Sequence, residues 1–459
     1  MAYIVFVAMV SAIYAINRYD VQRAFVNVWI PFLMLLPTAW YVNIPGLPDP
    51  NFSQAAVIPI IFVLVTRQLH TIELGKIEFL IFIYFTFRFA VDWQSRGYWD
   101  AQNYAFDLLT TMVAPYMMGR YIINSRQMDI ATAKMLVLMF LVQAPGFIYE
   151  LRMWQPPVYR VFGFLFPFDA SGLSVRYGLA RITGPFTHPI LACVIFIALY
   201  RLHKWLDWMG VWKQPQTGLY GVFLGWSRRF PLSFSMHITI IFIVMIILTF
   251  SRGPWIGGMA GAALTAVGNA GNRKRALYIF VVLMVIGGMG AEAAFNYYLM
   301  PGSDGKISEG AETMLYRKIM LDRYEAFIWE KPWTGWGLTT VPQVQGMESI
   351  DNAYFLMALQ HGIPAPVLFV IIFLYAIGTQ IKFGLDSSAK EPPLGFTFAG
   401  IYLSCFFAFA TVYIGGQTPA LLFLFLGWGE GIRKRGVQSL GPDDAKPVAA
   451  PPPFRKVIY

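Results

Sequence analysis

The residues best suited to chemistry in this sequence are arginines that stand beside glycine and proline at the ends of apolar segments. Arg181 opens the segment Arg-Ile-Thr-Gly-Pro-Phe-Thr-His-Pro, which contains His188 and leads directly into an apolar run. Arg252 lies in Ser-Arg-Gly-Pro-Trp, between two apolar runs with almost no loop. Because the planar guanidinium group binds phosphate and carboxylate through two parallel hydrogen bonds, arginine suits these ligands better than lysine does. The positions predict recognition of a phosphate or a carboxylate.

A further group of polar residues lies downstream. Arg317 and Arg323 precede the segment Lys-Pro-Trp-Thr-Gly-Trp-Gly, and Asp351 follows it immediately before the next apolar run. The Gly-rich turn between them would allow Arg317 and Asp351 to meet. A positioned carboxylate or imidazole can accept a proton from a reacting hydroxyl. Asp351 and His188 carry groups of this kind.

Each of these residues also has a simpler structural interpretation. His188 and Asp351 stand where helices begin and would serve as N-caps. Arg252 would extend its side chain to the lipid headgroups. Aromatic residues of the same segments would stack on sugars or form a belt at the membrane interface; they are Trp154, Tyr159, Trp329, Trp333 and Trp336.

The composition identifies the elements that must position these residues. The chain has 459 residues, of which 57% are hydrophobic and 13% are charged. Soluble domains carry about 25% charged residues, so this composition excludes a soluble enzyme, a disordered scaffold and a secreted disulfide domain. We predict an all-α, polytopic transmembrane helix bundle of about 12–13 spans, with a large, partly helical periplasmic loop.

The basic residues predict the orientation. The Lys and Arg residues of 201–229, 273–275 and 433–435 fall on one side of the predicted spans, which the positive-inside rule assigns to the cytoplasm. Met1–Ile16 lacks a basic leader region and is expected to be a retained helix. The predicted organisation is N-terminal transmembrane helices in 1–150, a periplasmic Arg-rich loop in 151–189, central transmembrane helices in 190–299, a large periplasmic loop in 300–352, C-terminal transmembrane helices in 353–435 and a disordered cytoplasmic tail in 436–459.

The loop 151–189 departs from the charge rule. It carries Arg152, Arg160, Arg176 and Arg181 against the single acid Asp169. Basic residues are usually scarce on the outer side. Headgroup anchoring is one explanation, and phosphate binding by Arg176 and Arg181 is the other.

In their order between apolar runs, these motifs resemble the O-antigen ligase and polymerase superfamily of bacterial inner-membrane glycosyltransferases. The likeness covers roughly residues 181–383. It consists of Arg-x-x-Gly-x-Phe-x-x-Pro from Arg181 to Pro189, Ser-Arg-Gly from Ser251 to Gly253, Arg317 upstream of Pro332-x-x-Gly335-x-Gly337, and Asn-x9-Gly from Asn352 to Gly362.

The resemblance implies a membrane glycosyltransferase that needs no metal and no cofactor, with its active site facing the periplasm. Its partners would be a polyprenyl-pyrophosphate-linked glycan donor, a glycan acceptor, the lipid bilayer, a chain-length regulator and export machinery, and no nucleic acid. The candidate residues are Asp351, His188, Arg252 and Arg317 for catalysis, and Arg181, Arg176, Arg323, Asn352 and Trp336 for substrate binding.

One departure from the family favours a polymerase. Lipid A-core ligases of this superfamily have a catalytic His where Asp351 stands, and a Gly, Thr or Tyr where Ala365 stands. Asp-Asn at this point is more similar to members that serve exopolysaccharide and capsule synthesis. Two alternatives stay open: a ligase that transfers finished glycan to lipid A-core or another acceptor, and a non-enzymatic flippase or exporter of lipid-linked oligosaccharide.

Overall fold

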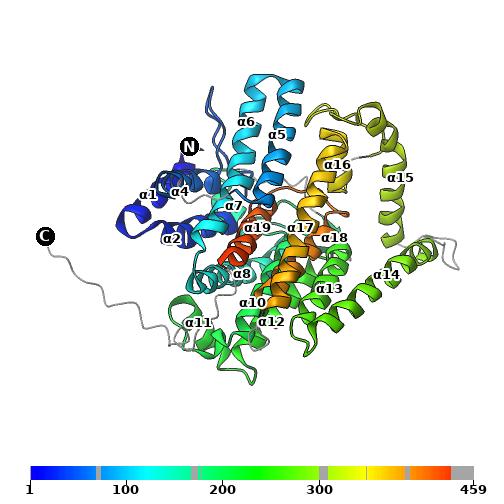
Figure 1. Ribbon diagram of the computed structural model, residues 1–459. Coiled ribbons are helices and arrows are strands. Elements are labelled where there is room, and N and C mark those ends of the chain that lie inside the picture. Colours follow the sequence, from blue (N-terminus) through cyan, green and yellow to red (C-terminus); the bar gives the residue numbers. More distant parts are fainter. Residues whose placement is uncertain are drawn as a thin grey trace.

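In the computed structural model the chain is a helical bundle (Figure 1), which confirms the all-α prediction. The structure describes residues 2–68, 74–166, 174–176, 178–298, 309–347, 349–387 and 393–435. The predicted tail 436–459 and Asp169 lie outside these residues. One short antiparallel hairpin joins β1 (Val175–Arg176) to β2 (Leu179–Ala180), with Val175 opposite Ala180.

The helices follow one another with short connections. They are α1 (Phe6–Arg18), α2 (Val21–Ala24), α3 (Ile30–Leu35), α4 (Phe52–Gln68), α5 (Lys76–Arg96), α6 (Tyr98–Leu108), α7 (Ala114–Met117), α8 (Arg126–Met153), α9 (Pro157–Phe162), α10 (Pro189–Trp208), α11 (Gly218–Ser227), α12 (Phe234–Leu248), α13 (Arg252–Val267), α14 (Arg273–Tyr298), α15 (Glu309–Glu330), α16 (Ala353–His361), α17 (Pro364–Asp386), α18 (Leu394–Ala408) and α19 (Thr418–Arg435). Wider π turns η2 (Phe25–Trp29), η4 (Leu109–Val113) and η5 (Met118–Ile122) interrupt the α-helical path.

Apolar helices identify the chain as a membrane protein. Among the described residues, α8, α10 and α17 are long and apolar enough to cross a bilayer by length and composition. Shorter apolar helices of 10 to 17 residues lie at Tyr3–Arg18, Val21–Leu35, Phe52–Arg67, Phe234–Leu248 and Leu394–Ala408. Fewer helices therefore meet the length criterion than the sequence predicted, because several apolar runs are divided by turns.

Proline and glycine decide where the apolar runs divide. Pro59 and Pro145 lie inside α4 and α8 and do not end these helices. The chain leaves α3 at Leu35, two residues before Pro37. The apolar run over residues 353–381 is split at Gly362 into α16 and α17.

The buried helix α19 packs against the segment formed by η4, α7 and η5 at very short range. A side chain at Gly427 would place its Cβ within 1.9 Å of the Tyr116 carbonyl oxygen, and one at Gly119 would lie 2.3 Å from the Leu424 carbonyl oxygen. Small residues let helix backbones approach in this way inside membranes. The two glycines therefore set the distance between the N-terminal and C-terminal halves of the bundle.

This contact gives a stability prediction. Gly427→Ala should lower the free energy of unfolding by about 1–3 kcal/mol, the usual cost of overpacking a well-packed core. Gly378→Ala in α17 is the matched control, because nothing lies within 4 Å of its added Cβ. Thermal unfolding of the detergent-solubilised protein measures both. Equal melting temperatures for the two variants would show that the close contact between α19 and the segment formed by η4, α7 and η5 does not limit stability.

Candidate functional site

The site lies where loops from three parts of the chain converge near the start of α16. In Figure 1 α16 stands at one end of the bundle with α5, α6 and α15. The loop before α10 supplies His188, the hairpin supplies Arg176 on β1, and α15 supplies Arg317. The sequence predicted all three as site residues, and the structure brings them together.

Arg181 joins the first predicted motif to the second. Its side chain is 6% exposed, its Nε donates to the Thr249 carbonyl oxygen at 2.8 Å, and its Nη2 donates to the Ser251 hydroxyl at 2.7 Å. Buried polar groups are costly unless they are hydrogen-bonded, so these bonds fix the loop onto the turn between α12 and α13. Arg181 therefore acts from within the wall of the site.

The turn between α12 and α13 is built to present carbonyl oxygens. Phe250 has φ of 47°, a left-handed conformation that is uncommon for residues other than glycine. Its own carbonyl accepts a hydrogen bond of 3.0 Å from Nη1 of Arg176, beside the Thr249 carbonyl used by Arg181. The turn thus holds two guanidinium groups next to each other.

Arg317 approaches from α15. Its Nη2 donates to the Thr411 carbonyl oxygen at 3.1 Å, while its Nε is buried and has no hydrogen-bond partner among the described residues. A buried N–H without an acceptor is rare in native proteins. Gly253, at the start of α13, packs against the side chain of the same residue, Thr411. We call Arg176, Arg181 and Arg317 the arginine cluster.

The charges of the cluster act on one another. Burial first, and then the neighbouring Arg176 and Arg317, lowers the pKa of Arg181 to about 10. Burial also lowers the pKa of Arg317, Arg176 lowers it further, and Asp351 opposes the shift. Positive charge is therefore concentrated here, and an anionic ligand would relieve the repulsion.

His188 is the N-cap of α10, which confirms its structural interpretation. Its Nδ1 accepts the backbone N–H of Ile190 at 3.2 Å. Burial first, and then Arg181 and Arg317, lowers its pKa to about 4. A neutral ring that accepts at Nδ1 carries its proton on Nε2. His188 is thus a hydrogen-bond donor at neutral pH and is poorly suited to act as a base.

Asp351 lies among the charges of the cluster and does not cap the helix. The cap of α16 is Asn352, whose Oδ1 accepts the Phe355 N–H at 3.1 Å. The N-cap interpretation of Asp351 was therefore wrong by one residue, because Asn is as good a cap as Asp. The Asp351 carboxylate accepts a hydrogen bond of 2.8 Å from the Ser349 hydroxyl and keeps further acceptor capacity.

The glycines of the third motif interlock the large loop with α16. Gly335 has φ of +64°, and a Cβ there would lie 2.5 Å from the Gln360 carbonyl carbon. Gly362 has φ of +76° and meets Trp333 in the same way. The N–H groups of Trp336 and Gly337 donate to the last carbonyls of α16 at 2.8 Å. The motif thus fixes the end of α16 to the loop that follows α15.

Other predicted residues lie outside the cluster. Arg323 lies six residues further along α15 than Arg317, which is less than two full turns and places it on another face, and it donates to the Gln345 carbonyl at 3.1 Å. Trp336 holds the loop by donating to the Phe327 carbonyl at 2.9 Å. Arg252 is exposed on the first turn of α13, directly after Ser251.

Two residues that the sequence analysis did not single out belong to the site. Glu150 is buried, and its carboxylate accepts hydrogen bonds from the Thr183 and Gly184 N–H groups at 2.9 and 2.8 Å. The Tyr413 ring lies 6.3 Å from the His188 ring, centroid to centroid. A lone acid at the end of a predicted span was a signal for Glu150, whereas nothing in the sequence marks Tyr413. Among the described residues, no group of three or more His, Cys, Asp or Glu side chains is placed to hold a metal ion.

The His188 pKa gives a prediction about pH. Because His188 has a lower pKa in the folded state than in the unfolded state, protonation below pH 6.5 favours unfolding, and its contribution to stability is lost as the pH falls towards 4. His188→Asn keeps a good N-cap and removes the titration. Between pH 7 and pH 4.5, the melting temperature of the wild type should fall by about 2 to 4 °C more than that of this variant. Parallel falls would contradict the assignment.

Comparison with known proteins agrees with this geometry. Residues 237–370 match the O-antigen ligase family model, and no curated protein matches the chain. The matched segment contains Arg252, Arg317, Asp351 and Asn352. The first motif precedes it and is tied to it by the hydrogen bonds of Arg181.

The family is associated with glycan transfer of the ligase or polymerase type, on lipid-linked glycans at a membrane. Over residues 237–370 the chain is thus similar to the O-antigen ligase family, in agreement with the resemblance predicted from the motifs.

Proposed function

We propose that the protein is a glycan polymerase of the bacterial inner membrane that acts on the periplasmic side. It transfers a growing glycan from polyprenyl pyrophosphate to a sugar hydroxyl of a second lipid-linked repeat unit, and so makes exopolysaccharide, capsule or O-antigen. The observation that carries the proposal is the convergence of Arg176, Arg181 and Arg317 with one carboxylate, Asp351.

The arginine cluster suits a pyrophosphate leaving group. As the bond between the anomeric carbon and the pyrophosphate oxygen breaks, its electron pair leaves with the pyrophosphate, and fixed cations stabilise that charge. Within the described part of the chain, the buried Nε–H of Arg317 has no acceptor, and Arg176 uses one Nη group on a backbone carbonyl. Both have N–H groups left to donate, whereas Arg181 acts mainly by positioning the turn.

The carboxylate completes the reaction. The acceptor hydroxyl oxygen forms the new bond to the anomeric carbon, and its proton passes to Asp351, which acts as general base. Neutral His188 donates from Nε2 to an oxygen of either substrate. Asn352 holds the start of α16 by capping it, and thereby fixes the direction of the neighbouring Asp351.

The first test removes one cation. In a strain that lacks the gene, Arg317→Gln should restore little polymer, with a loss in rate of about 10²- to 10³-fold, comparable to removing one donor to a developing anion. Arg317→Lys should recover part of it. Lys318→Gln, an exposed cation one residue further along α15, is the control and should behave as wild type. Glycan length and lipid-linked intermediates are measured by gel and mass spectrometry, at matched membrane expression.

The same strain separates the alternatives. A polymerase defect leaves single lipid-linked repeat units outside the cytoplasmic membrane. Finished polymer that stays on its lipid carrier would instead identify a ligase. Repeat units trapped inside the cell would contradict both enzymes and indicate a flippase.

The second test concerns the base. Asp351→Asn keeps the size of the side chain and removes its capacity to accept a proton, so polymerisation should fall by about 10²- to 10⁴-fold. Asp322→Asn on the exposed face of α15 is the matched control. Full polymer length with Asp351→Asn would show that another group accepts the proton.

A further inference from the structure

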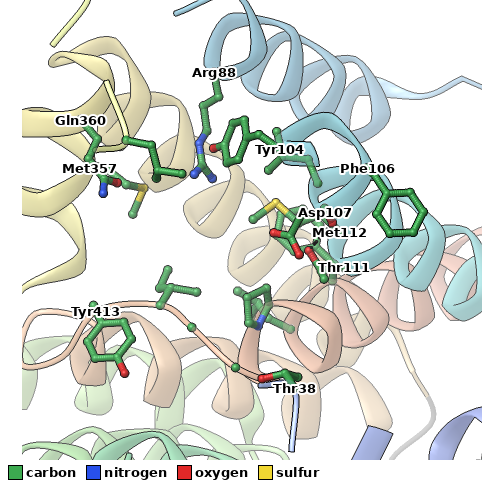
Figure 2. Close-up of a pocket in the computed structure, with 18 of the residues that line it drawn as sticks. Thr38, Arg88, Tyr104, Phe106, Asp107, Thr111, Met112, Met357, Gln360 and Tyr413 are labelled. Carbon is green, nitrogen blue, oxygen red and sulfur yellow. Dashed lines mark hydrogen bonds between the residues drawn. The ribbon is translucent and has the colours of Figure 1, made fainter. Parts of the chain in front are cut away.

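A large cavity lies beside the arginine cluster and differs from it in chemistry. Its volume is about 620 Å³, and its walls come from α4, α5, α6, η4, α16 and the loop before α19. Figure 2 shows Arg88 and Tyr104 close together, Asp107 and Thr111 further along, and Tyr413 across the cavity. None of the site residues that the sequence predicted lines this cavity, although Ala353, the residue after Asn352, does.

The lining of the cavity carries little net charge. It contains one guanidinium, Arg88, and two carboxylates, Asp49 and Asp107. A pyrophosphate would meet more negative than positive charge here and would be repelled. The remaining polar groups are amides and hydroxyls, and several tyrosine rings lie among them; they are Thr38, Tyr41, Asn51, Gln54, Tyr84, Asn103, Tyr104, Thr111, Gln360 and Tyr413. Mixed amide, carboxylate and aromatic groups fit a neutral ligand rich in hydroxyls.

Arg88 supplies an unused donor. It is 8% exposed, its Nη1 donates to the Tyr84 hydroxyl at 2.9 Å, and its guanidinium lies 5.5 Å from the Tyr104 ring centre. Its Nε is buried without a partner among the described residues. Asp107 is the counterpart acceptor: one carboxylate oxygen takes a hydrogen bond of 2.9 Å from Gln54, and the side chain is otherwise exposed to the cavity.

The wall that carries Gln360 is fixed by a buried pair. His361 Nε2 lies 2.9 Å from the Asp92 carboxylate, and both side chains are at most 1% exposed. The other Asp92 oxygen accepts the Leu338 N–H at 3.3 Å. This pair joins α16, α5 and the large loop at one point, and its hydrogen bonds hold these walls of the cavity in place.

The cavity and the arginine cluster share a wall. Tyr413 lines the cavity and also packs against His188. Ala353, another lining residue, follows Asp351 and Asn352 directly. A ligand in the cavity would therefore lie beside the segment that carries the candidate base.

We propose that this cavity binds the terminal sugar of the acceptor glycan and presents its hydroxyl to Asp351. The inference rests on the proposed function. The donor sugar is bonded to the pyrophosphate and must lie at the arginine cluster, so the space beyond Tyr413 is left to the second substrate. Arg88 would donate hydrogen bonds to the sugar, Asp107 would accept them and Gln360 would do both, and together they would select an uncharged sugar ring.

The test uses full-length protein in nanodiscs and two probes: inorganic pyrophosphate, and oligosaccharides released by mild acid from the surface polysaccharide of the source cells. Binding is measured as a ligand-induced shift in melting temperature. Gln360→Met removes polar atoms at similar volume, and Asp107→Asn removes a charged acceptor. Oligosaccharide affinity should fall about fivefold in the first and about tenfold or more in the second, with pyrophosphate binding unchanged. Gln343→Met, an exposed change outside the cavity, is the control.

The two proposals fail separately. Arg317→Gln should lose pyrophosphate binding and keep oligosaccharide binding. Wild-type protein that does not bind pyrophosphate would contradict the proposed function. Oligosaccharide binding that is absent in wild type, or equal in wild type, Gln360→Met and Asp107→Asn, would overturn the acceptor site. In two-substrate kinetics, a raised KM for the donor instead of the acceptor in the cavity variants would also overturn it.

Discussion

The buried guanidinium of Arg181 is the interaction on which the site depends. A cation in this position is tolerated only because its N–H groups meet fixed oxygen acceptors from Thr249 and Ser251. Those acceptors exist because the backbone turns through a left-handed residue at Phe250. The geometry of the turn, the position of Arg176 and the approach of α13 therefore follow from satisfying one charge.

The same principle recurs on either side of the cluster. Glu150 ties the loop before α10 to the end of α8, and Asp92 ties α16 to α5 through His361. In each case a buried carboxylate accepts hydrogen bonds from an irregular segment that has no helical ladder of its own. A chain with few charges thus uses several of them to hold loops in place, whereas Asp351 accepts, from the residues that the structure describes, one hydrogen bond, which comes from a side-chain hydroxyl.

Local patterns were sufficient to predict the helical fold and the arginines of the cluster, because apolar periodicity and glycine–proline turns act over a few residues. Arg176 and Arg181 were found from charge on the side where it is unexpected, and Arg317 from its place before the Gly-rich turn. Tyr413 and Arg88 were not, because their roles come from contacts between segments distant in sequence. The confusion of Asp351 with Asn352 has a local cause: both residues cap helices well, and only the backbone shows which of them begins α16.

The close packing of Gly335 and Gly362 limits how far the large loop can move away from α16. Backbone hydrogen bonds from Trp336, Gly337 and Ile363 tie the large loop to both ends of the break between α16 and α17. Lifting that loop would unwind the end of α16 and displace the wall that carries Gln360. The rim of the cavity therefore keeps its shape for as long as the large loop stays hydrogen-bonded to α16.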